Sequence, residues 1–375
     1  MQQKYIVIGA GILGASTAYH LARAGCDVLV VDRNDAGQAT DAAAGIVCPW
    51  VSQRRNKAWY ELVKSGARYY PTLIKELEAL GETNTGYKRV GAISLHTEDK
   101  KLDGIQERAL KRRPDAHEIG EVNRLSPEDS HDLFPPLGEE YSSVHISGGA
   151  RVNGRALRDA LINAAIGYGA SFRKGDATLL FQKNRVTGIE VDGETINGDK
   201  IIVTAGAWAK QLIQPLGINF IVTGQKAQIV HLEIPETDTS NWPVVMPPNN
   251  QYLLAFEDGR VVVGATHEDD VGFDLRVTAG GLHEIFDKAL RVAPGLANST
   301  VVETRVGFRP FTPGFLPVIG ALPNFEGIYV ANGLGASGLT AGPYLGAELA
   351  KLAQGQQIEL DLTRYDVAGA VESIK

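Results

Sequence analysis

The sequence predicts an α/β fold in which a parallel-sheet domain is interleaved with a smaller α+β domain built on a mainly antiparallel sheet. Three observations support this prediction. The chain begins with an apolar strand, a Gly-x-Gly-x-x-Gly turn and a helix within residues 4–25. Short alternating apolar segments fill residues 221–309, which is typical of antiparallel strands. A second glycine-rich turn between an apolar strand and a helix follows at residues 327–340.

The first 32 residues predict a strand, helix, strand unit. Residues 4–8 are a continuous apolar strand, and small residues at helical spacing follow until Gly25 ends the helix. Residues 27–31 form the next buried strand, which ends at Asp32. A unit of about 30 residues with this order is the setting in which the glycine pattern binds a dinucleotide.

Each residue of this pattern has a distinct expected role. Gly9 permits the tight turn, Gly11 lets a pyrophosphate approach the backbone, and Gly14 allows the helix to pack closely. Asp32 can accept hydrogen bonds from both hydroxyls of an adenosine ribose, and its charge disfavours the 2′-phosphate of NADP. The unit does not indicate whether the bound dinucleotide is NAD or FAD. The alternative is a tight turn that binds nothing.

Apolar spacing predicts the remaining elements in chain order. They are helical segments at 59–80 divided near Pro71, a strand at 90–95, a polar helix at 102–110, a helix start at 126–129, a helix at 157–168, strands at 186–191, 200–204, 228–232, 252–256 and 260–266, and a helix at 282–292. The changes of pattern assign residues 1–85, 145–220 and 310–375 to the dinucleotide domain. Residues 86–144 and 221–309 are assigned to the second domain.

Composition restricts the function classes. The chain has 375 residues, of which 44% are hydrophobic and 22% charged, as expected for a globular protein of about two domains. A net charge of -7 and short basic clusters give no footprint for nucleic acid. Cys26 and Cys48 lack metal-ligand spacing, so no metal site is expected, and they are too few for a disulfide framework.

The start of the chain and its hydropathy predict the compartment. We find no leader pattern and no apolar run near the ~20 residues that cross a bilayer, so the expected location is cytoplasmic, without an integral membrane segment. Peripheral contact with the inner face of a membrane and assembly into a homo-oligomer are left open.

Several short motifs occur in one order along the chain. They are Gly9-Ala-Gly-Ile-Leu-Gly14, Asp32, Thr40-Asp-Ala-Ala-Ala-Gly-Ile46, Val203-Thr-Ala-Gly-Ala-Trp208, Gly264-Ala-Thr266, Gly307-Phe-Arg-Pro310, Leu316-Pro-Val-Ile-Gly320 and Gly333-Leu-Gly-Ala-Ser-Gly-Leu-Thr340. In this order the chain resembles the FAD-dependent D-amino acid oxidase (DAO) superfamily over nearly its whole length, and is most similar to the glycine oxidase and D-amino acid dehydrogenase branches. The resemblance implies a Rossmann-type FAD-binding domain interleaved with a substrate domain.

The resemblance also implies an activity. The expected reaction oxidises a small amino acid, namely a D-amino acid, glycine or a secondary amine such as proline, by hydride transfer from Cα to flavin N5. Oxygen or a quinone would then take up the electrons. Two alternatives are left open: a 2-hydroxy acid oxidoreductase, and a flavin-binding subunit for electron transfer or tRNA modification.

The substrate residues are expected in the second domain. Arg309 matches the arginine of the family's Gly-x-Arg-Pro motif and offers two parallel donors to a carboxylate. Tyr252 matches a tyrosine that contacts the same carboxylate, although a packing role is equally open. His267 is expected to line the pocket or to face solvent. Arg305, on the same strand face as Arg309, is interpreted as a surface arginine paired with an acid.

The resemblance assigns cofactor contacts to the motif residues. They are Gly9, Gly11, Ile12, Leu13, Gly14, Asp32, Arg33, Thr40, Ala43, Ala44, Gly45, Ile46, Thr204, Gly206, Trp208, Gly307, Gly333, Gly335, Ala336, Ser337, Gly338, Leu339 and Thr340. The motif after Gly307 lacks the cysteine by which the sarcosine oxidase branch of the family attaches its flavin covalently, so the resemblance implies non-covalent FAD. Leu334 and Ala336 stand where the glycine oxidase branch commonly has histidine and arginine. A less polar pocket disfavours glycine as the preferred substrate and favours an apolar D-amino acid or a secondary amine.

Overall fold

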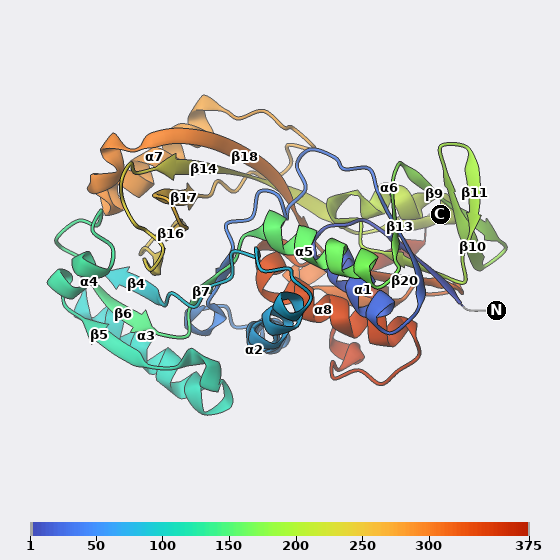
Figure 1. The fold of residues 1–375 in the computed structure, drawn as a ribbon, viewed down its shortest axis with the longest axis horizontal. Coiled ribbons are helices and arrows are strands. Elements are labelled where there is room, and N and C mark those ends of the chain that lie inside the picture. The colour runs from blue at the N-terminus through green and yellow to red at the C-terminus, as the bar shows by residue number, and fades with distance from the viewer. Residues whose placement is uncertain (1–2, 374–375) are drawn as a thin grey trace.

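The fold contains two large sheets that lie at opposite ends of an elongated molecule (Figure 1). A computed structural model describes residues 3–373. The first sheet has six strands in the spatial order β19 (Val318–Ala321), β20 (Ile328–Asn332), β12 (Lys200–Val203), β1 (Lys4–Ile8), β2 (Asp27–Asp32) and β8 (Ser171–Lys174). Neighbouring strands are parallel except β19 and β20, which are antiparallel.

Four helices pack beside this parallel sheet. They are α1 (Ile12–Arg23), α2 (Lys57–Ala79), α5 (Gly154–Gly167) and α8 (Gly338–Ala353). Small residues allow α1 and α8 to approach closely, since a Cβ added at Gly346 would lie 2.6 Å from the Cβ of Ser16. The Ser16 hydroxyl donates to the carbonyl of Pro343 at 2.6 Å. The first and last parts of the chain are therefore joined directly.

The predicted division of the helical region near Pro71 is wrong. Residues Lys57–Ala79 form one continuous helix with Pro71 inside it. Proline removes one backbone donor and normally bends or ends a helix. Here Tyr70, Leu73 and Leu77 on the same helix are fully buried. Burial of this face on both sides of Pro71 favours one continuous helix over two shorter ones.

The second sheet has eight strands and is mainly antiparallel. Their order is β18 (Thr300–Phe311), β14 (Thr223–Glu233), β17 (Arg260–Gly264), β16 (Tyr252–Ala255), β15 (Val244–Met246), β4 (Ala92–His96), β6 (Ser142–Ile146) and β5 (Val122–Leu125). Only the pair of β15 and β4 is parallel. Helix α7 (Ala279–Val292) packs against β14 and β17, and α3 (Asp99–Arg112) and α4 (Pro127–Leu133) lie beside β5 and β6.

Smaller sheets complete the fold. Strands β9 (Ala177–Gln182), β10 (Arg185–Val191) and β11 (Glu194–Asn197) form a three-stranded sheet, and β13 (Ile218–Phe220) with β21 (Val371–Ser373) and β3 (Ile46–Val47) with β7 (Ala150–Arg151) form pairs. The predicted α/β class, with a parallel sheet and a mainly antiparallel second sheet, is confirmed. The strands of the eight-stranded sheet come from residues 92–146 and 223–311, while the predicted domain boundaries stay a prediction.

No helix among residues 3–373 is both long and apolar enough to cross a membrane.

The buried His231 on β14 predicts a loss of stability in acid. Burial lowers its pKa to about 4, and the Arg305 guanidinium adds to this effect. An unfolded histidine titrates near 6.5, so the unfolded state takes up the proton first as pH falls. Between pH 7.5 and 5 this one group should lower the free energy of unfolding by about 2 kcal/mol.

Unfolding in urea at both pH values measures this loss. In His231→Leu, which cannot titrate, the difference between the two pH values should be smaller by that amount. An unchanged difference would contradict the assignment to His231.

Candidate active site

One cavity of about 630 Å³ lies where the loops of the parallel sheet meet β16 and β18. Its walls include the residues that follow the carboxyl ends of β1, β2, β12 and β20, which is where open α/β sheets bind ligands. All the predicted cofactor and catalytic residues except Gly14 line this cavity. The structure thus brings together residues from position 9 to position 340.

Gly14 lies behind the cavity wall and has a packing role. A Cβ at this position would lie 1.8 Å from the carbonyl oxygen of Gly9 and 2.5 Å from the Thr204 hydroxyl. Gly9 itself has a φ of +100°, which favours glycine. At Gly11 the nearest atom to an added Cβ is the Thr40 hydroxyl at 3.3 Å, so its missing side chain leaves room on the cavity side.

Asp32 lines the cavity and also fixes the loop beside it. Its carboxylate accepts hydrogen bonds from the Ala10 amide at 2.5 Å and from the Gln38 side chain at 2.9 Å. The residue is 8% exposed. Neighbouring Arg33 is ion-paired with Asp35 and Asp176. The position at the cavity wall suits an adenosine contact, and ribose recognition by Asp32 stays a prediction.

Residues 40–46 are hydrogen-bonded to the first turns of both helices that follow the glycine-rich loops. The Thr40 hydroxyl accepts from the Ile12 amide at 2.9 Å, at the start of α1. The Thr340 hydroxyl of α8 donates to the Ile46 carbonyl at 2.9 Å. The N-termini of both helices therefore face one cavity, and their partial positive charge suits an anionic ligand.

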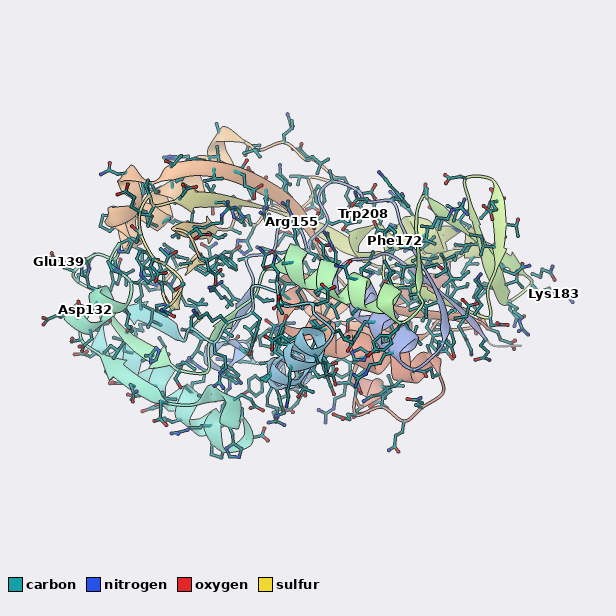
Figure 2. The ribbon with its side chains drawn as sticks, in the orientation of Figure 1. Asp132, Glu139, Arg155, Phe172, Lys183 and Trp208 are labelled. Atoms are coloured by element: carbon teal, nitrogen blue, oxygen red, sulfur yellow. The ribbon has the colours of Figure 1, made fainter. Side chains whose placement is uncertain are left out.

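Residues 204–208 close another side of the cavity. The Thr204 hydroxyl donates to the Gly9 carbonyl at 2.8 Å. The Trp208 ring stacks on Phe273 with centroids 5.0 Å apart, and Phe308 packs edge-on against both rings. Trp208 lies near the middle of the molecule, far from Lys183 at one end and Glu139 at the other (Figure 2).

The glycine-rich loop at residues 333–340 packs closely against its neighbours. A Cβ at Gly333 would lie 1.8 Å from the Thr312 hydroxyl, and one at Gly335 would lie 2.1 Å from the Phe311 ring. Both glycines have positive φ values, of +82° and +52°. The Trp59 ring nitrogen donates to the Ser337 hydroxyl at 2.9 Å. Ala336, Gly338 and Leu339 complete this wall.

Arg309, Tyr252 and His267 line the cavity together. Arg309 donates to the Gln225 side-chain oxygen at 3.2 Å, and within residues 3–373 it makes no ion pair. Arg305, two positions earlier, is ion-paired with Glu303 and donates to the Asp41 carbonyl at 3.1 Å, as expected for a paired arginine.

Burial and the charge of Arg309 shift the pKa values of Tyr252 and His267. Burial raises the pKa of the Tyr252 hydroxyl, and the Arg309 charge only partly opposes this shift. Burial also lowers the pKa of His267, and the Arg309 charge lowers it further. Both side chains are therefore uncharged at neutral pH, and Arg309 is the cation of this group.

Sequence reasoning missed several residues of the cavity. Gln38, Trp59, Asn250 and residues 175–178 also line it. Residues 175–178 comprise the short turn after β8 and the start of β9, and β8 pairs in parallel with β2 so that Lys174 lies opposite Asp32. Recognising residues 171–174 as a sheet strand would have placed this turn beside Asp32. Asn250 and Trp59 carry no such sequence signal.

The residues that line the cavity suit FAD in their chemistry. Its size is within the range of ligand pockets, its glycine loops leave backbone N–H groups accessible, and two helix N-termini face it. Within the described residues no group of three or more His, Cys, Asp or Glu side chains gathers as metal ligands would. This arrangement can hold an anionic dinucleotide, and Arg309 lines the same cavity.

Comparisons with known proteins agree with this geometry. Residues 4–352 match the DAO family, described as FAD dependent oxidoreductase. The chain is 64% identical over 370 residues to the uncharacterized oxidoreductase YurR of Bacillus subtilis, covering 98% of this chain and 100% of that one. It is 30% identical over 377 residues to the glycine oxidase of Pseudomonas aeruginosa, covering 98% and 100%.

A solved structure is also similar along nearly the whole chain. The iminodiacetate oxidase IdaA of Chelativorans sp. BNC1 is 49% identical, with a TM-score of 0.94 over 96% of this chain and 98% of that one. The predicted family and its glycine oxidase relatives are therefore confirmed. This chain belongs to the DAO family and is an FAD-dependent oxidoreductase, as the order of its motifs predicted.

Proposed function

We propose that this protein oxidises the carbon–nitrogen bond of a small amine that carries a carboxylate on the adjacent carbon. The observation that carries the proposal is Arg309, an arginine at the cavity wall without an ion pair among the described residues. A guanidinium in this state binds a carboxylate through two parallel hydrogen bonds, which fixes the position of the neighbouring carbon.

Tyr252 and His267, which line the cavity together with Arg309, complete the proposed binding of substrate. When bound, FAD supplies a ring that accepts a hydride from the substrate carbon. Tyr252 offers a neutral hydroxyl beside Arg309, and His267 offers a neutral ring, so neither opposes a cationic guanidinium. An uncharged substrate amine is needed when hydride leaves, and a neutral His267 is a suitable partner for it.

Within this class we propose a secondary amine with two carboxylates, of the iminodiacetate type. The 49% identity to a protein named iminodiacetate oxidase supports this choice. Asn250 is suited to the second carboxylate: its side-chain oxygen accepts from Lys288 at 2.9 Å, and its N–H donors have no partner within residues 3–373. Leu334 and Ala336 at the wall disfavour glycine as the preferred substrate.

Anaerobic mixing tests the proposal. The purified yellow protein is mixed without oxygen with iminodiacetate, sarcosine, glycine, D- and L-proline, D- and L-alanine, glycolate and lactate, and the visible flavin band is followed. Bleaching by carboxylated amines but not by the two hydroxy acids is expected. Bleaching only by the hydroxy acids, or by nothing, would overturn the proposed function. Repeating the reaction with oxygen or a quinone then identifies the electron acceptor.

We propose that FAD is bound without a covalent link. Within residues 3–373 the cysteines are Cys26 and Cys48, and only Cys48 lines the cavity. Burial raises the pKa of the Cys48 thiol to about 12, so the reactive thiolate is essentially absent at neutral pH. After heat denaturation and centrifugation all the yellow colour should remain in the supernatant. Flavin that stays with the precipitated chain through washing in denaturant would contradict this.

A further inference from the structure

Lys226 on β14 is a fully buried lysine outside the cavity. Its side chain is 0% exposed, and its ammonium group lies 3.2 Å from an oxygen of Asp274 and 3.5 Å from one of Glu268. Both carboxylates belong to the irregular segment 266–278 between β17 and α7. A buried ammonium group is stable only with such partners, so Lys226 fixes this segment against the strand.

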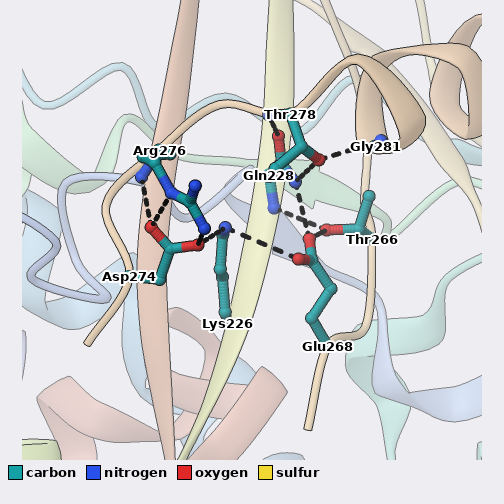
Figure 3. Close-up of polar contacts among 8 residues, drawn as sticks. All are labelled: Lys226, Gln228, Thr266, Glu268, Asp274, Arg276, Thr278 and Gly281. Carbon is teal, nitrogen blue, oxygen red and sulfur yellow. Dashed lines mark hydrogen bonds and ion pairs between the residues drawn. The ribbon is translucent and has the colours of Figure 1, made fainter. Parts of the chain in front are cut away.

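Further hydrogen bonds fasten the same segment (Figure 3). The Gln228 side chain donates to Glu268 at 2.6 Å and to the Thr278 hydroxyl at 3.0 Å, and accepts from the Thr278 amide at 2.9 Å. The Lys226 and Glu268 backbones exchange two hydrogen bonds of 2.9 Å. Most residues from 269 to 277 are exposed. Order in this segment therefore depends on contacts with neighbouring elements, namely the polar contacts with β14 and the packing of Phe273 on Trp208 and Phe308, rather than on a core of its own.

Segment 266–278 is linked in two ways to the part of the cavity that Arg309 lines. His267 lines the cavity directly. Asp269 accepts a hydrogen bond from the Gln225 side-chain nitrogen at 3.0 Å, and the oxygen of the same Gln225 amide accepts from Arg309 at 3.2 Å. The hydrogen bond to Asp269 thus holds the Gln225 amide in the direction in which its oxygen accepts from Arg309.

We propose that segment 266–278, fastened by Lys226, is a positioning element that aligns Arg309 for the substrate carboxylate through Asp269 and Gln225. The inference rests on the proposed function, because it assigns Arg309 to carboxylate binding. Lys226, Asp269 and Gln225 are positioning residues and need not touch substrate. Loss of any one of them frees the Arg309 side chain to adopt other rotamers. Binding a carboxylate must then also order that side chain, and the lost conformational entropy weakens binding.

Acetate binding to the FAD-loaded protein tests the inference without turnover. The change in the visible flavin spectrum gives the dissociation constant for wild type, Lys226→Met, Asp269→Ala and Arg309→Ala. Methionine fits the volume of the lysine stem, and the two carboxylates it leaves are partly exposed at 26% and 22%, so they remain hydrated. Lys226→Met and Asp269→Ala should each weaken acetate binding on the order of tenfold, as expected for a lost hydrogen bond to a charged group.

The double variants show whether the effect passes through Arg309. In an Arg309→Ala background, neither Lys226→Met nor Asp269→Ala should weaken acetate binding further. Asp270→Asn is the matched control: it removes one negative charge from the same segment, its side chain has no partner among the described residues, and asparagine suits its φ of +58°. It should bind acetate within about twofold of wild type.

The outcomes separate the two proposals. Acetate binding that is unchanged in Arg309→Ala would overturn the assignment of Arg309 and with it the proposed function. Binding that is weakened in Arg309→Ala but unchanged in Asp269→Ala would overturn only the positioning role. If Lys226→Met does not fold, the exposed Asp269→Ala still decides the question. Equal weakening by Asp270→Asn would also overturn the inference, because it would reduce the effect to net charge.

Discussion

Replacing Arg309 with alanine is expected to raise the KM for a carboxylated amine by about a hundredfold or more while FAD stays bound. The guanidinium is the cation at the substrate end of the cavity that has no ion pair within residues 3–373. Its removal would leave the carboxylate of the proposed substrate beside the neutral side chains of Tyr252 and His267. Steady-state kinetics together with the flavin absorbance per protein measure both parts of this prediction.

Arg305→Ala is the matched control for this experiment. Arg305 lies two residues before Arg309 on the same strand, but it forms an ion pair with Glu303 and does not line the cavity. Its removal should change KM by less than about threefold. Arg309→Lys should recover part of the lost binding, since a lysine keeps the charge but not the paired donors. Similar KM values for Arg309→Ala and Arg305→Ala would refute the special role of Arg309.

Gly14→Ala is expected to lower the free energy of unfolding by about 3 kcal/mol and to reduce the yield of folded protein. The added Cβ would lie 1.8 Å from the Gly9 carbonyl oxygen, so helix α1 must move away from β1. Both elements are held by the parallel sheet and by α8, so little movement is available. Denaturant unfolding of the variant measures the loss.

Gly11→Ala provides the contrast in the same turn. Here the nearest atom is a side-chain hydroxyl at 3.3 Å, so the chain should fold with a stability close to wild type. The new methyl group lies at the cavity wall, where it should weaken FAD binding by obstructing close approach to the backbone. Fluorescence titration of the apoprotein with FAD measures this. A Gly11→Ala variant that loses stability but retains FAD would reverse the assigned roles of the two glycines.

Much of the fold and the cavity could be predicted from the sequence because the signals are local. Strand β1 agrees with its predicted bounds, and the turn from Gly9 to Gly14 needs glycines for reasons of φ and close packing that any chain obeys. Parallel strands place their carboxyl ends at one edge. Motifs that follow separate strands, such as residues 204–208 and 333–340, therefore meet in one cavity.

Tertiary contacts decided what the sequence by itself left open. Residues Lys57–Ala79 stay one helix through Pro71 because buried side chains on both sides of the proline outweigh its local preference. Residues 175–178, between β8 and the start of β9, line the cavity because β8 pairs with β2. The link from Asp269 through Gln225 to Arg309 joins residues 44 and 84 positions apart. Local sequence determined the turns and strands, whereas packing and strand register, which depend on distant residues, determined which side chains meet.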